Sequence, residues 1–145
     1  MKVAAVQMTS LPNVAANLAE AGRLVAEAAA QGAKLVVLPE NFSFMGAKDA
    51  DRAVAREAFG AGAAQRFLAE TAQRLGLWLV GGTIPIVDGA ERAAQRSLLV
   101  GPDGKVAAYY DKIHLFDVDV PGKAERYAES ASTEPGSRVV AASTA

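Results

Sequence analysis

Glu40 and Lys112 each stand at the end of an apolar segment, where a charged side chain could take part in chemistry. Glu40 closes "AKLVVLPE", and the carboxyl ends of strands in open α/β sheets border the ligand crevice. Lys112 precedes "IHLF", whose apolar side chains would desolvate an ammonium and favour a carboxylate partner. A carboxylate can transfer protons, and an ammonium can stabilise a developing oxyanion. Taken singly, however, such residues are more often an exposed carboxylate and a surface lysine.

The remaining polar residues offer weaker candidates. Histidine is a common general base, but the chain has no cysteine and no serine in a G-x-S-x-G elbow for His114 to activate, so we interpret His114 as structural. Asp117 and Asp119 alternate with apolar residues, which predicts an extended segment with one wet face and makes a poor calcium loop. The glycines of "VGGT" and "VGPDG" do not open a helix after a strand, as those of the G-x-G-x-x-G and P-loop motifs do, so nucleotide binding is unsupported.

The elements that must position these residues begin with a strand, a helix and a second strand. Residues 2–8 are apolar and end at a turn, which predicts a buried strand. Asn13 can cap a helix whose apolar stripe continues to Ala28, and Gly32 stands where a helix C-terminal glycine is expected. Residues 33–40 predict the second strand. This order is typical of a crossover unit with two parallel strands.

After a loop around "NFSFMG", the rest of the chain predicts two helical stretches and then mostly strands. The better helix is expected near residues 64–75, a strand over 77–87, and a β-hairpin over 97–111 around "GPDG". Residues 137–143 predict a last strand, and residues 122–132 a mobile loop. These elements indicate an α/β fold.

Composition excludes several classes of function. Fifteen basic residues against sixteen acidic ones give a net charge of −1, so we expect no nucleic-acid partner. No apolar run approaches the roughly 20 residues of a membrane span, and the start lacks a secretory signal, so we predict no membrane partner and a cytoplasmic location. The absence of cysteine excludes disulfides and thiolate metal sites from these residues.

Three segments, "VAAVQM", "LVVLPENF" and "GPDGKVAAYYDKIHLFDVDVPGK", together resemble the nitrilase, or carbon-nitrogen hydrolase, superfamily. The last of them is most similar to the Nit branch, which includes omega-amidase-like and deaminated-glutathione-amidase-like enzymes. The resemblance implies an α-β-β-α sandwich that is incomplete at the C-terminus, with residues 1–145 as the N-terminal portion of a single domain. It further implies a small-molecule amide substrate, no metal or organic cofactor, and a homo-oligomer in the full-length form.

The resemblance also implies roles for particular residues. Glu40 matches the family's general base, Lys112 its lysine and Glu129 a further active-site glutamate, whereas the nucleophilic cysteine has no counterpart among these residues. Lys112 would then point into the active site and meet Glu40 on one side and Glu129 on the other. Arg96 stands where relatives commonly have asparagine. Two hypotheses follow: an amidase of which this is part, or a non-catalytic module of the same fold that acts in assembly or binding.

Overall fold

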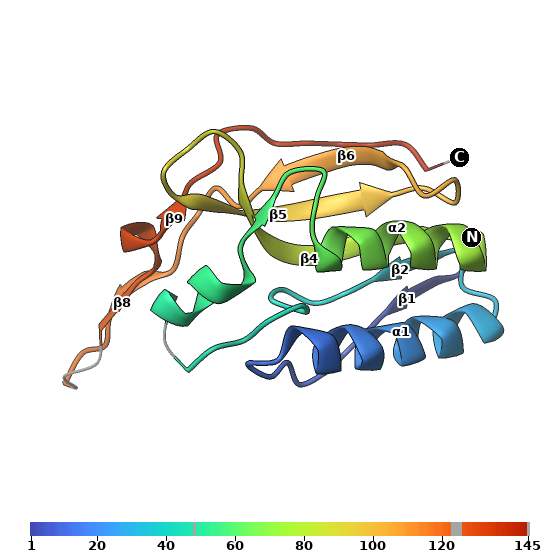
Figure 1. Cartoon of the computed structure of the whole chain (residues 1–145), viewed down its shortest axis with the longest axis horizontal. Coiled ribbons are helices and arrows are strands. Elements are labelled where there is room, and N and C mark those ends of the chain that lie inside the picture. Colours follow the sequence, from blue (N-terminus) through green and yellow to red (C-terminus); the bar gives the residue numbers. More distant parts are fainter. Residues whose placement is uncertain (48, 123–125, 145) are drawn as a thin grey trace.

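The computed structural model describes residues 1–47, 49–122 and 126–144, and its centre is one mixed β-sheet (Figure 1). The main path through this sheet has the order β1-β2-β4-β5-β6, while β3 (Glu57–Ala58) adds to β4 and β9 (Thr133–Glu134) adds to β5. The five strands of the path are β1 (Val3–Ala5), β2 (Leu35–Val37), β4 (Trp78–Val87), β5 (Ala93–Val100) and β6 (Val106–Asp111).

The predicted crossover unit at the start of the chain is confirmed. Helix α1 (Val14–Ala30) connects β1 to β2, and the two strands are parallel. Asn13 caps the helix by accepting a hydrogen bond from the backbone N–H of Ala16, and Gly32 follows the helix with a φ of 87°. Strand, helix and parallel strand therefore come from local signals that the sequence carries.

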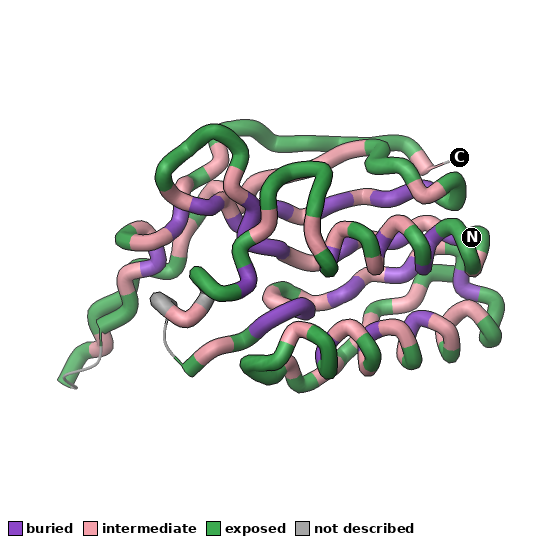
Figure 2. The backbone as a smooth tube through the Cα atoms, in the orientation of Figure 1, coloured by how far each residue is buried: buried purple, intermediate pink, exposed green. Residues whose placement is uncertain are grey.

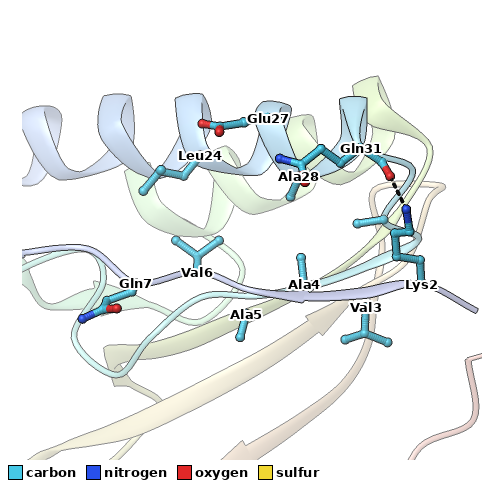
Figure 3. Close-up of a pocket in the computed structure, with 11 residues that line it drawn as sticks. Lys2, Val3, Ala4, Ala5, Val6, Gln7, Leu24, Glu27, Ala28 and Gln31 are labelled. Carbon is cyan, nitrogen blue, oxygen red and sulfur yellow. Dashed lines mark hydrogen bonds between the residues drawn. The ribbon is translucent and has the colours of Figure 1, made fainter.

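The expectation that the first strand is buried is wrong. Figure 3 shows Ala4 and Val6 pointing toward α1, whereas Val3 and Ala5 point away from it. Strand β1 lies at one end of the strand order and is covered by the helix on one face, so alternate side chains remain exposed. A groove of about 290 Å³ runs between β1 and α1, and Lys2 Nζ closes one end by donating to the carbonyl of Gln31 at 2.7 Å.

The second helix, α2 (Ala63–Leu75), also matches the prediction and ends at Gly76, which has a φ of 61°. It packs beside α1, and both helices cover the same face of the sheet. Of the helices in the described part of the chain, none is long and apolar enough to cross a membrane. Residues from the two helices and three strands form the core, among them Ala21, Val25, Leu68, Ala72, Val36, Leu79, Leu98 and Val100.

The predicted hairpin is confirmed as β5 and β6, joined by a turn in which Gly104 has a φ of 77°. After β6, strands β7 (Asp117–Asp119) and β8 (Arg126–Ala128) form a second, antiparallel pair. This pair projects from the body as an exposed arm (Figure 2). All three residues of β7 are exposed, so the aspartates do not alternate with a buried face.

Two predictions for the C-terminal third are wrong. Residues 126–128 and 129–131 are not loop but form β8 and a 3-10 helix, η2 (Glu129–Ala131), while residues 123–125 lie outside the described ones. Residues 137–143 form no strand in the described structure but run beside β6 (Figure 1). An apolar run becomes a strand only when its backbone pairs with another strand. Here Val140 and Ala142 instead line a hollow together with residues of β6. Another 3-10 helix, η1 (Asp49–Ala55), precedes β3.

Candidate active site

Lys112 is held at the end of β6 by its own backbone. Its N–H donates to the carbonyl of Gln95 at 3.0 Å, and its carbonyl accepts from the N–H of Gly136 at 2.9 Å. The Nζ atom donates to Glu40 Oε1 at 2.9 Å and to Glu129 Oε2 at 2.8 Å. The lysine side chain is 23 % exposed. The expected convergence of Lys112 with both glutamates, from positions 72 and 17 residues away, is therefore confirmed.

Glu129 is carried to the lysine by the β7–β8 pair. Its side chain is only 3 % exposed, and Oε2 also accepts a hydrogen bond from the N–H of Phe116 at 2.8 Å. The N–H of Ser130, which follows Glu129, donates to Asp117 Oδ1 at 3.0 Å. Hydrogen bonding by Ser130, first by its side chain and then by its backbone N–H, lowers the pKa of Asp117. Asp119 pairs with Arg126 across the hairpin. The two aspartates thus stabilise the arm that returns Glu129 to the site.

Glu40 follows β2 in a tight turn. The next residue, Asn41, has a φ of 56°, a left-handed conformation uncommon outside glycine, and its N–H donates to Thr83 Oγ1 at 2.9 Å. The carbonyl of Pro39 accepts from the N–H of Phe42 at 3.2 Å. These bonds fix the direction in which the Glu40 side chain leaves the backbone.

Gly82 on β4 is the residue that lets this turn lie close to the sheet. A Cβ at position 82 would overlap the carbonyl group of Pro39 and lie 2.9 Å from the carbonyl oxygen of Leu38. Both neighbours are backbone, so they cannot rotate away as a side chain could. The identity of residue 82 therefore controls where Glu40 sits.

We expect Gly82→Ala to destabilise the chain by about 1–3 kcal/mol, the usual range for overpacking. The turn must shift, so the Lys112–Glu40 contact should lengthen while the Lys112–Glu129 contact remains. Urea unfolding measures the first effect, and NMR shifts of the glutamate carboxyl carbons measure the second. Gly22→Ala in α1, where only side-chain carbons of Phe67 lie near, is the matched control and should be neutral or stabilising. Equal effects of the two substitutions would contradict this role for Gly82.

A pocket of about 340 Å³ opens on the sheet face that the helices leave uncovered. Glu40 and Lys112 line it together with the polar side chains of Thr83, Ser97 and Tyr110, and its floor includes Leu38 and Val80. A mainly apolar hollow with a few convergent polar groups is typical of small-molecule sites.

Two carboxylates around one ammonium decide the charge state of the site. Although burial favours the neutral amine, the hydrogen bonds that the ammonium donates to Glu129 and Glu40 outweigh it and raise the pKa of Lys112 above its ordinary value. The lysine is therefore a fixed cation at neutral pH. Such a cation can stabilise an oxyanion, and a carboxylate beside it can exchange protons with a bound molecule.

The sequence-based account of the lysine's surroundings is wrong in one respect. The "IHLF" segment does not bury Lys112, because His114 and Phe116 are exposed. The cover comes instead from the pocket wall and from Glu129. Arg96, noted in the sequence without a role, proves to be buried and ion-paired with Asp111 and Asp88. Among the described residues, no group of three or more His, Cys, Asp or Glu side chains could hold a metal ion.

Comparison with known proteins supports the same family over the whole length. Residues 2–145 match the family model described as carbon-nitrogen hydrolase. The omega-amidase of Danio rerio is 43 % identical over 135 residues, which are 93 % of this chain and 47 % of that protein. The deaminated glutathione amidase of Synechocystis is 41 % identical over 93 % of this chain and 49 % of that protein. The chain thus spans about half the length of the curated relatives it matches.

Solved structures show the corresponding similarity of fold. The NitFhit protein of C. elegans superposes with a TM-score of 0.80 at 27 % identity, covering 95 % of this chain and 34 % of that one. A branch 10 member of the nitrilase superfamily from Saccharomyces cerevisiae gives 0.79 at 29 % identity, covering 95 % and 49 %. An amidase from Nesterenkonia, solved with acrylamide added at its active-site cysteine, gives 0.77 at 28 % identity, covering 95 % and 50 %.

The predicted fold class is confirmed by these matches, and the helix layer and main sheet described above correspond to about half of each nitrilase-superfamily chain from yeast and Nesterenkonia. The relatives in sequence are omega-amidases and deaminated glutathione amidases, and the neighbours in structure include Nit proteins. The resemblance found in the three sequence segments therefore holds for the chain as a whole. The chain belongs to the carbon-nitrogen hydrolase family.

Proposed function

We propose that this chain forms part of an amidase that hydrolyses carbon-nitrogen bonds in small molecules. Glu40 would act as the general base, Lys112 as the stabilising cation and Glu129 as the residue that keeps the lysine charged and oriented. The observation that carries the proposal is the contact of one lysine Nζ with both carboxylates, at 2.9 and 2.8 Å, beside a pocket. The nucleophile would be a cysteine outside these 145 residues, since they contain none.

The proposed reaction assigns each proton. Glu40 takes the proton of the cysteine thiol, and the sulfur attacks the amide carbonyl carbon to form a tetrahedral oxyanion beside the Lys112 ammonium. The carbon-nitrogen bond then breaks as Glu40 returns its proton to the leaving nitrogen. Glu40 then deprotonates a water molecule, whose oxygen attacks the thioester carbon. The carbon-sulfur bond breaks, the acid is released, and Glu40 returns the proton to the sulfur. Glu40 Oε1 already contacts the lysine, so Oε2 is the candidate for proton transfer.

The substrate class we propose is a small amide such as the ω-amide of a short acid. Omega-amidase and deaminated glutathione amidase are the names of the relatives that support it. A pocket of about 340 Å³ lies at the small end of the range for small-molecule sites, about 300–1,000 Å³.

A second candidate is a non-catalytic module that keeps this fold for assembly or binding. The absence of cysteine from all 145 residues is the observation that favours it. The two candidates differ in what the complete reading frame encodes after this sequence: a strand followed by a cysteine supports the amidase, and an immediate stop codon supports the module.

We expect the 145-residue chain alone to release no ammonia from ω-amides, because an unactivated amide needs a covalent nucleophile. The protein encoded by the complete reading frame should release it. An ammonia-release assay on both proteins tests the proposal, with N-carbamoyl compounds as a second substrate set. Turnover by the 145-residue chain that disappears on Glu40→Gln would contradict the proposed mechanism, and inactivity of both proteins on both sets would favour the module.

Three sequence-based expectations stay predictions. These are the homo-oligomer of the full-length form, the lack of a nucleic-acid partner, and the cytoplasmic location. The near-balanced charge of the chain supports the second of them.

A further inference from the structure

Arg96 on β5 is a buried charge with an unusually complete set of partners. Its side chain is 5 % exposed. Nε and Nη2 donate to the two carboxylate oxygens of Asp111 at 2.7 and 2.9 Å, and Nη1 donates to Asp88 at 2.9 Å. The guanidinium carbon lies 4.1 Å from the ring centroid of Tyr109 and 4.7 Å from that of Phe59. These contacts join the β4–β5 connection, β5, β6 and the segment after β3 in one place.

This cluster lies directly behind the lysine of the candidate site. Arg96 and Asp111 are opposite each other in the β5–β6 ladder, and Asp111 immediately precedes Lys112. Successive side chains of a strand point to opposite faces, so Asp111 turns toward Arg96 while Lys112 turns toward the pocket. The backbone of Lys112 is bonded to Gln95, the neighbour of Arg96. The two faces of the sheet are thus coupled through adjacent residues.

We propose that Arg96 is a positioning residue for Lys112: by clamping Asp111, it fixes the end of β6 from which the lysine reaches Glu40 and Glu129. The placement of the lysine is independent of any reaction, and only its catalytic consequence rests on the proposed function. The fork of two parallel hydrogen bonds holds both the position and the rotation of the Asp111 carboxylate. A single-point cation could not fix the rotation.

Asp111 is the partner that matters most within the cluster. Its side chain is 21 % exposed, whereas that of Asp88 is 50 % exposed and so can exchange its bond to Arg96 for water. The hydrogen bonds that Arg96 donates to Asp111 and then to Asp88, against the opposing effect of burial, raise the pKa of Arg96, which therefore stays charged throughout the working range of the protein. The clamp is permanent, and its loss requires substitution.

The test uses the ammonium group of Lys112 as a direct reporter in the 145-residue chain. A lysine held by two carboxylates exchanges its ammonium protons slowly with water, so Lys112 should give a separate signal in ¹⁵N NMR, assigned by its loss in Lys112→Met. We expect Arg96→Gln and Arg96→Lys each to speed this exchange at least about tenfold or to abolish the signal, because the fork is lost in both. Arg23→Gln is the matched control.

Arg23 is suitable because it also forms a two-bond fork, with Glu20, but on the exposed surface of α1. Its loss should leave the Lys112 signal unchanged. Asp88→Asn, which removes the exposed partner of Arg96, should change the exchange rate less than threefold. If Arg96→Gln fails to fold, the double variant Arg96→Gln/Asp111→Asn replaces the charged pair by two amides and keeps both groups hydrogen-bonded.

The possible results distinguish a positioning role of Arg96 from a merely structural one. A folded Arg96→Lys or double variant with fast Lys112 exchange supports positioning, and a folded variant with an unchanged Lys112 signal overturns it. Equal acceleration in Arg23→Gln would also overturn it, because the effect would then be general. Since no turnover is measured, a failure of the proposed amidase function leaves this result intact, and the reverse also holds.

Discussion

Replacing Lys112 with methionine is expected to lower the free energy of unfolding of the 145-residue chain by about 3 kcal/mol. Removing one partner of a buried ion pair typically costs about 3–5 kcal/mol, because the remaining charge stays buried. Glu129 is the residue left behind, with its side chain 3 % exposed. We take the lower end of that range because Lys112 is 23 % exposed and Glu40 can turn to water. Urea unfolding followed by circular dichroism measures the loss.

Two further variants test whether this loss of stability is specific to the site. Lys105→Met removes an exposed lysine of the same hairpin, which contacts Asp103 at 3.7 Å, and should cost less than about 0.5 kcal/mol. Adding Glu129→Gln to Lys112→Met should recover much of the loss, because the buried carboxylate that lost its ammonium partner is then gone. A double variant no more stable than Lys112→Met would show that lost packing, and not the buried charge, explains the effect.

The stability difference between the unaltered chain and Lys112→Met is also expected to depend on pH. The pKa of Lys112 is raised in the folded state, so its stabilising contribution is complete below the ordinary lysine pKa of 10.5 and is lost as pH rises through the raised value. The stability difference between the unaltered chain and Lys112→Met should therefore be constant from about pH 7 to 9 and shrink above about pH 10.5. Groups that do not contact Lys112 titrate alike in both chains and cancel. A difference that shrinks toward acidic pH alone would contradict the raised pKa.

Replacing Glu40 with glutamine is expected to abolish most turnover in the protein encoded by the complete reading frame. General acid–base catalysis is typically worth about 10²–10⁴-fold, and an amide cannot take up the thiol proton. The loss should appear in kcat more than in KM, because glutamine keeps the size of the side chain. Stability should change by less than about 1 kcal/mol, since the Glu40 side chain is 51 % exposed and exposed ion pairs contribute little.

Glu134→Gln provides the control for this substitution. Glu134 is similarly exposed, at 43 %, and pairs with Arg92 at 2.9 Å, away from the pocket. The change should leave turnover as it is while producing a comparable change in stability. If Glu40→Gln retains more than about a third of the unaltered kcat, Glu40 is not the general base.

Much of the chain's local structure was predictable because it depends on neighbours in sequence. The Asn13 cap, the apolar stripe of α1 and the glycines that end both helices are local signals, and the structure contains them as expected. The "GPDG" turn likewise set the register of β5 and β6. The prediction of a last strand was wrong for the opposite reason. Whether residues 137–143 join a ladder depends on a distant partner strand that no local pattern encodes.

The sequence by itself determined the family, the positions of Glu40 and Lys112 close after an apolar strand, and the lack of a thiol in these residues. Tertiary structure alone decided what surrounds the lysine. His114 and Phe116 of the "IHLF" segment that was expected to cover it are exposed, and two carboxylates from distant segments hold it instead. Arg96 gives a second example. The sequence shows that residue 96 is an arginine, but its two hydrogen bonds to Asp111 follow from the pairing of β5 with β6. Apolar periodicity reports which face of an element is buried, whereas ion pairs between distant segments arise only when the sheet brings those segments together.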